Sequence, residues 1–145
     1  MAANVDEHGR QVVDAIGYDG GLHCDLRVTD LGRAIDWYTD VLGFSVIHHV
    51  PEAGWAELQT PVADVRVGLT AVETMPPPGG GAVLTFNVRD VDASRAYLES
   101  RDGVRFDGDT CTIEGWVRLA TVFDPDGNPL MLAQSLVGAA TESAF

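Results

Sequence analysis

His23 and Asp25 are the residues whose types and spacing could carry chemistry in this sequence. They lie two residues apart in residues 22–28, whose alternation of apolar and polar positions predicts a β-strand. Side chains at i and i+2 of a strand share a face, so Asp25 can approach the imidazole and orient it as an acid or base. The simpler interpretation is that His23 only lines a pocket, while Asp25 and Arg27 neutralise each other at its rim.

The strand at 22–28 begins a regular order of predicted elements. Asp30 is a favourable helix N-cap and Gly43 a favourable glycine after a helix end, so we expect a helix between them. Its apolar face follows helical spacing: Leu31, Ala34, Ile35, Tyr38, Val41 and Leu42. Strands are expected near 44–50, 54–60 and 65–72.

The same order of elements occurs twice. The run LRVTDL at 26–31 aligns with FNVRDV at 86–91, a shift of 60 positions, and Gly43 then falls on Gly103. In the second half the sequence predicts a strand at 82–88, a helix at 91–101 and strands near 104–107, 110–113, 116–123 and 130–134. We therefore expect an α+β fold of two βαβββ modules, at 21–74 and 82–136. A Pro/Gly linker at 75–81 joins them, an extension at 1–20 precedes them without a clear periodicity, and a tail follows at 137–145.

Composition excludes several function classes. The formal net charge of −13 disfavours DNA, RNA and anionic membrane surfaces as partners. No apolar stretch approaches the roughly 20 residues of a membrane span. The N-terminal residues lack the basic and apolar segments of a signal peptide, so we expect a cytoplasmic protein.

Two runs resemble a known family. LHCDLRVTDLGRAIDWYTDVLGF looks like the opening of a vicinal-oxygen-chelate protein, and FDPDGNPLMLAQ looks like the closing signature of that superfamily. The superfamily includes glyoxalase I, bleomycin-resistance proteins and extradiol dioxygenases, and the resemblance covers residues 21–136. It implies two cup-shaped mixed sheets that face each other around a cavity.

The resemblance also implies four positions for metal ligands, which are His or Glu in metal-using relatives. Here they are His23, Gly68, Val83 and Met131. A catalytic divalent ion needs about three protein ligands, and a soft thioether does not suit the metals of this family. We therefore expect no metal and no cofactor.

Strand parity predicts a wall for the cavity. The side chains expected to line it mix apolar groups with a few polar ones, as small-molecule sites do. We expect Trp55 and Trp116 to stack on a flat ligand, although packing is the commoner use of tryptophan. The complete predicted set is His23, Asp25, Arg27, Trp55, Arg66, Gly68, Thr70, Val83, Thr85, Asn87, Trp116, Arg118, Met131 and Ala133.

Three functions stay open at this point. The first is a metal-independent protein that binds a small organic molecule, for example to sequester an antibiotic. The second is a metal-free isomerase, cyclase or lyase in which His23 and Asp25 move a proton. The third is a divalent-metal enzyme of the glyoxalase or dioxygenase type with atypical ligands. In each case we expect a homodimer, because half-open sheets leave edges and a concave face to be covered.

Overall fold

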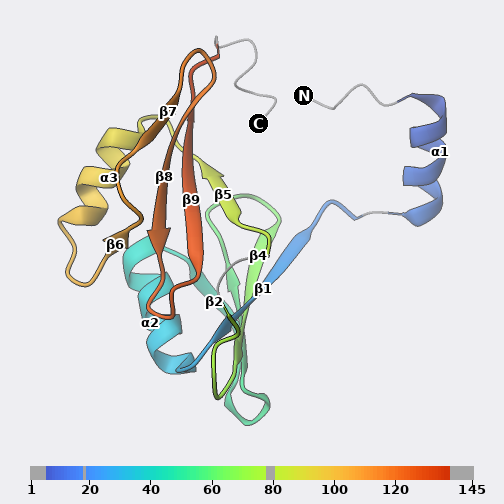
Figure 1. The fold of residues 1–145 in the computed structure, drawn as a ribbon. Helices are drawn as coiled ribbons and strands as arrows, with labels where there is room; N and C mark the ends of the chain where they lie inside the picture. The colour runs from blue at the N-terminus through green and yellow to red at the C-terminus, as the bar shows by residue number, and fades with distance from the viewer. Residues whose placement is uncertain (1–5, 18, 78–80, 138–145) are drawn as a thin grey trace.

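The computed structural model describes residues 6–17, 19–77 and 81–137 and contains two open mixed sheets (Figure 1). The first sheet has the strand order β1-β4-β3-β2, with β1 parallel to β4. Helix α2 (Leu31–Leu42) packs on one face of this sheet, and a short 3-10 turn, η1 (Pro51–Ala53), precedes β3. The strands are β1 (Leu22–Val28), β2 (Ser45–Val50), β3 (Trp55–Gln59) and β4 (Val65–Ala71).

The second sheet repeats this plan. Its order is β5-β9-β8-β6, with β5 parallel to β9, and β7 also pairs with β8. Helix α3 (Val91–Glu99) packs on β8 and β9. The strands are β5 (Leu84–Asn87), β6 (Arg105–Phe106), β7 (Cys111–Ile113), β8 (Val117–Phe123) and β9 (Pro129–Ser135). The expected α+β fold of tandem modules is confirmed.

Helix signals in the sequence set the helix boundaries. The Asp30 carboxylate accepts a hydrogen bond from the Arg33 N–H, and Gly43 ends α2 with a φ of 74°. Asp90 caps α3 in the same way. Helix α3 nevertheless ends at Glu99, two residues before the predicted end, so Gly103 belongs to the loop that follows.

One hydrophobic core joins the two modules. Val28, Tyr38 and Leu69 of the first module are fully buried together with Val122 and Leu130 of the second. The apolar residues of β1 and β4 therefore face α2, as strand parity predicts. The opposite face of the first sheet carries the polar positions.

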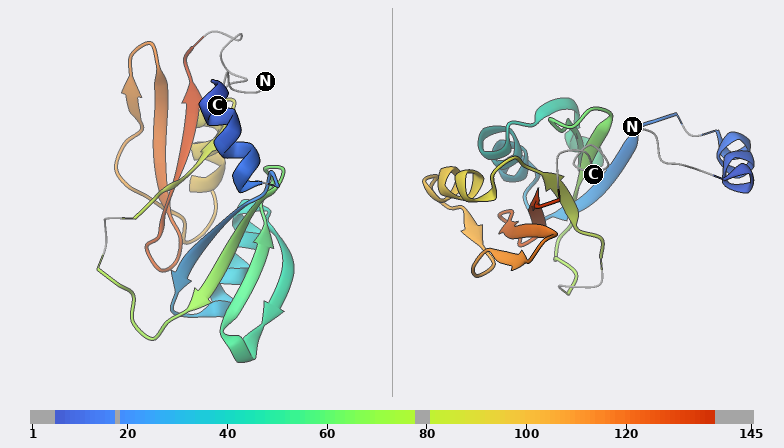
Figure 2. Two further views of the ribbon diagram at one scale, coloured as in Figure 1. Left: turned by 90° about the vertical axis from the view of Figure 1, so that its right-hand side faces the viewer. Right: turned by 90° about the horizontal axis from the view of Figure 1, so that it is seen from above.

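The N-terminal segment contains a helix that the sequence does not predict. Helix α1 (Glu7–Ile16) begins after its N-cap Asp6 and ends at Gly17 in the left-handed conformation. It stands apart from both modules and buries none of its residues (Figure 2). No helix of the described ranges is long and apolar enough to cross a membrane. The expected extension at 1–20, linker at 75–81 and tail at 137–145 include residues 1–5, 18, 78–80 and 138–145, which lie outside the described residues.

Candidate functional site

The face of the first sheet opposite α2 brings together most of the polar residues predicted for the wall. We call this face, with side chains from β1, β3 and β4, the first wall. Strand register places Asp25 of β1 opposite Gly68 of β4, and Gly68 opposite Glu57 of β3. Because Gly68 has no side chain, groups on the two strands that flank β4 can reach each other across it.

His23 pairs with Glu57 rather than with Asp25. The His23 Nδ1 lies 3.0 Å from Oε2 of Glu57, and the two side chains are 36% and 13% exposed. Asp25 instead accepts a hydrogen bond of 2.8 Å from the Thr70 hydroxyl. Glu57 is not among the predicted site residues, because strand spacing identifies neighbours on one strand and not the register of another strand.

Gly68 is the centre of this cluster. A Cβ atom built on Gly68 would lie 2.5 Å from Oδ1 of Asp25 and 2.6 Å from Nε2 of His23. Both distances are shorter than contacts that real Cβ atoms make. The two side chains therefore lean over the glycine, and any larger residue there would push at least one of them away.

Two further aromatic side chains lie beside His23 and Glu57. The His48 Nε2 is 3.9 Å from Oε1 of Glu57, so the carboxylate lies between two imidazoles. A register shift between Val46 and His48 places His48 opposite Glu57. Trp55 stacks beside His23, with ring centroids 6.4 Å apart and planes inclined by 23°.

The corresponding face of the second sheet, which we call the second wall, differs in character. Register places Thr85 opposite Met131, and Met131 opposite Thr121. Met131 therefore occupies the position that Gly68 has in the first sheet. Asn87 lies opposite Ala133, and Val83 is 40% exposed just before β5.

Trp116 and Arg118 lie away from both walls. Trp116 is 66% exposed in the turn before β8, and its backbone N–H donates to the Ile113 carbonyl. The Arg118 guanidinium donates to both carboxylate oxygens of Asp92 on α3, at 2.6 and 3.0 Å. It thus lies on the face that α3 covers. The two tryptophans differ in position, since β3 begins with Trp55 whereas β8 begins after Trp116.

Arg66 and Arg27 lie at the margins of the first wall. Arg66 is opposite His23 in register, and its Nη2 lies 3.0 Å from the Cβ position of Gly21, at the start of β1. Its Nε is buried and has no hydrogen-bond partner among the described residues. The Arg27 carbonyl accepts a hydrogen bond of 2.8 Å from the Asn128 side chain.

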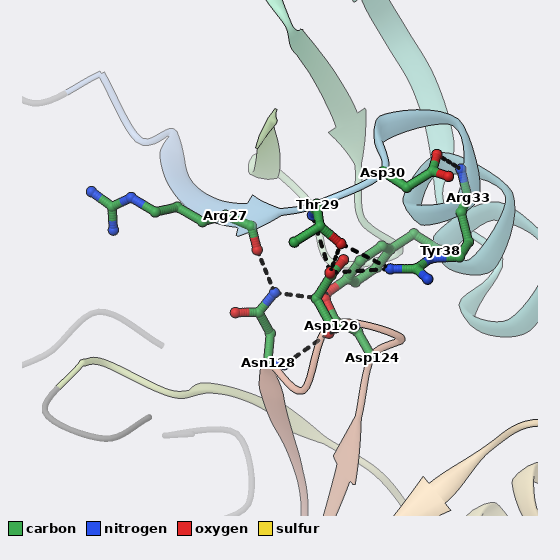
Figure 3. Close-up of polar contacts among 8 residues, drawn as sticks. All are labelled: Arg27, Thr29, Asp30, Arg33, Tyr38, Asp124, Asp126 and Asn128. Atoms are coloured by element: carbon green, nitrogen blue, oxygen red, sulfur yellow. Dashed lines mark hydrogen bonds and ion pairs between the residues drawn. The ribbon is translucent and has the colours of Figure 1, made fainter. Parts of the chain in front are cut away.

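The turn at 124–128 joins the modules (Figure 3). The Asp124 side chain is buried and accepts hydrogen bonds from the Tyr38 hydroxyl at 2.9 Å and from Asn128. Asp126 accepts from the Thr29 N–H at 3.0 Å and the Arg33 guanidinium at 3.1 Å. Burial, followed by the charge of Asp124, raises the pKa of Tyr38 well above its ordinary value.

A metal does not fit the four positions implied by the family resemblance. Of these four residues, His23 alone has a side-chain atom that suits the metals used by the family. Gly68 and Val83 have no donor atom, and Met131 has a soft sulfur. In the described part of the chain, no group of three His, Cys, Asp or Glu side chains could hold an ion.

Comparisons with known proteins agree with this fold. A model of the Glyoxalase/Bleomycin resistance protein/Dioxygenase superfamily matches residues 21–132. The crystal structure of TnmS3, an antibiotic binding protein from Streptomyces sp. CB03234, is 32% identical. That match has a TM-score of 0.65 and covers 82% of this chain and 98% of that one.

Two other relatives are similar over comparable lengths. A superfamily member from Sphaerobacter thermophilus is 26% identical, with a TM-score of 0.68 and coverage of 81% of this chain and 98% of that chain. A 2-epi-5-epi-valiolone epimerase from Actinomyces sp. is 28% identical over 152 residues, covering 83% of this chain and 81% of the relative.

Proposed function

Because the chain belongs to the Glyoxalase/Bleomycin resistance protein/Dioxygenase superfamily, we propose that it is a metal-independent protein that binds a small organic molecule on the first wall. The polar cluster around Gly68 carries this proposal. His23 and Asp25 lean over the glycine, Glu57 and Thr70 hold them, and Trp55 lies alongside. This combination of a few placed polar groups with an aromatic ring is typical of ligand sites.

The nature of one relative supports an antibiotic or a similar compound as the ligand. TnmS3 is an antibiotic binding protein, and its similarity extends over 82% of this chain. The first wall offers hydrogen-bonding groups and a flat indole surface, which together suit a molecule with both rings and polar substituents. Sequestering such a molecule needs no chemical step.

A metal-free isomerase is the second candidate, and the His23–Glu57 contact favours it. A carboxylate that holds one ring nitrogen of a histidine orients the other as a base. The relative from Actinomyces sp. is an epimerase, a reaction class that moves a proton. In this candidate His23 takes and returns the proton, Glu57 orients it and Asp25 binds the substrate.

The open first wall supports a homodimer. His23 and Asp25 are exposed on it, so a complete pocket needs a second surface. Pairing with a second copy would supply one without any change of fold. Light scattering of the full chain should give twice the chain mass, and a monomer that still binds its ligand would contradict the dimer.

Native mass spectrometry against a library of antibiotics and hydroxylated ring compounds tests the main proposal. We expect one ligand per chain, and His23→Ala or Asp25→Asn should weaken its binding by about tenfold. Asp109→Asn, at an exposed site of the second module, should leave binding unchanged. If the protein only binds its ligand, the ligand is recovered unaltered. Conversion of the ligand by the wild type, lost in His23→Ala, would establish the isomerase instead.

A further inference from the structure

The side chains above Gly68 define which chemical group the first wall binds. Two acceptor atoms, Oδ1 of Asp25 and Nε2 of His23, lie 2.5 and 2.6 Å from the Cβ position of Gly68. Within the described ranges neither atom has a hydrogen-bond partner, and the two side chains do not bond to each other. Two acceptors that flank one point repel each other unless a donor lies between them.

Glu57 makes His23 an acceptor at this point. An ionised carboxylate can only accept hydrogen bonds, so the 3.0 Å contact requires a proton on Nδ1 of His23. In the neutral ring the proton is then absent from Nε2, which presents a lone pair above Gly68. Glu57 is therefore a positioning residue that sets the tautomer.

Thr70 has the matching effect on Asp25. Its hydroxyl donates to Oδ2 at 2.8 Å, which leaves Oδ1 available to a ligand. Asp25 and Glu57 bring two carboxylates to this part of the wall, and among the described residues neither forms a hydrogen bond or ion pair with an arginine. A single ligand atom that reaches both acceptors must carry at least two hydrogens, and a positive charge improves its fit.

We propose that His23 and Asp25 form a receptor for a protonated primary amine of the ligand, above Gly68 and beside Trp55. This inference rests on the proposed binding function and specifies its ligand class. An ammonium group donates up to three hydrogen bonds from one atom, so it can satisfy both acceptors at once. The ring-bearing part of the ligand then lies along Trp55.

Two matched probes test the amine preference on the full chain: 1-naphthylmethylamine and 1-naphthalenemethanol. Binding is followed by NMR shifts of the Gly68 amide and the Trp55 indole. We expect the amine to bind about tenfold more tightly than the alcohol, since its hydrogen bonds are charge-assisted. Added salt should reduce this preference.

Variants locate the preference on the wall. Asp25→Asn should bring the two probe affinities together, and Gly68→Ala should do the same by displacing the acceptors. Asp109→Asn should retain the wild-type preference. Long-range proton–nitrogen correlation spectra at mildly alkaline pH should show His23 protonated on Nδ1, and both tautomers in Glu57→Gln.

The outcomes separate this inference from the function on which it rests. Equal binding of both probes at the wall, or His23 protonated on Nε2 in the wild type, would overturn the amine receptor and leave small-molecule binding intact. If neither probe shifts the Gly68 or Trp55 signals, both the receptor and the use of this wall are wrong.

Discussion

The two walls of this protein share a topology and differ in the residues that occupy the same row of the register. In the first sheet Gly68 lies between Asp25 and Glu57, and in the second Met131 lies between Thr85 and Thr121. The glycine lets side chains of the two flanking strands approach each other, whereas a methionine fills that space. A repeated scaffold can therefore hold a charged site in one copy and an uncharged surface in the other.

The β3–β4 and β8–β9 turns differ in a similar way. The turn at 60–64 is satisfied locally, with the Thr60 hydroxyl and the Gln59 amide both donating to the Val62 carbonyl. The turn at 124–128 instead extends its carboxylates to Tyr38, Thr29 and Arg33 of the other module. One turn closes a hairpin, and the other also joins the modules.

Removing the junction should have the largest effect. Asp124→Ala leaves Tyr38 and the backbone of the turn without their buried acceptor, so we expect a loss of about 3 kcal/mol in the free energy of unfolding. Thr60→Ala in the local turn should cost about 1 kcal/mol. Urea unfolding measures both, and equal losses would remove the distinction between the turns.

Adding metal ligands to the second wall should create a metal site. Wild-type protein should hold no stoichiometric zinc or nickel after dialysis, because His23 is the one suitable donor at the four family positions. Val83→His with Met131→Glu should raise zinc affinity by about 100-fold, measured by calorimetry. The same pair of changes in a His23→Ala background is the control. No gain over that control would show that the two modules are misaligned at these positions.

Alkaline pH should weaken the junction through Tyr38. Burial and Asp124 raise the pKa of its hydroxyl, so the folded protein keeps the proton after the unfolded chain has lost it. The free energy of unfolding should thus fall as pH rises above about 10, by up to about 1.4 kcal/mol per unit. Tyr38→Phe should remove this part of the slope in urea unfolding at about pH 9 and 11. An unchanged slope would contradict the assignment.

Filling the gap in the first wall should affect stability least. Gly68→Ala meets only the ends of two side chains, which can move aside, so we expect a cost below about 1 kcal/mol. Gly43→Ala provides the contrast, since its φ of 74° strains any side chain and should cost about 1 kcal/mol or more. Thermal unfolding compares the two. A larger loss for Gly68→Ala would mean that its neighbours are rigid.

Local signals in the sequence account for the elements of the modules. Asp30 and Gly43 delimit α2 because capping depends on residues within one turn of the helix, and alternation in β1 assigns its faces for the same reason. The repeat and the two family runs then predict the tandem fold. Helix α1 was not predicted, although it has the same local signals as α2: Asp6 caps its first turn, and Gly17 ends it in the left-handed conformation.

The partners within the site could not be predicted in this way. Sequence spacing places His23 and Asp25 on one face, but only the register of β3 and β4 brings Glu57 to His23 and Thr70 to Asp25. For the same reason spacing alone predicted Arg118 on the wall of the cavity, whereas its partner Asp92 lies on α3. The sequence by itself determined two modules, their faces and the residue types at the four family positions, because these depend on residue type and local periodicity. The tertiary structure alone decided which side chains meet, because hydrogen-bond partners are chosen by strand register and helix docking over long separations.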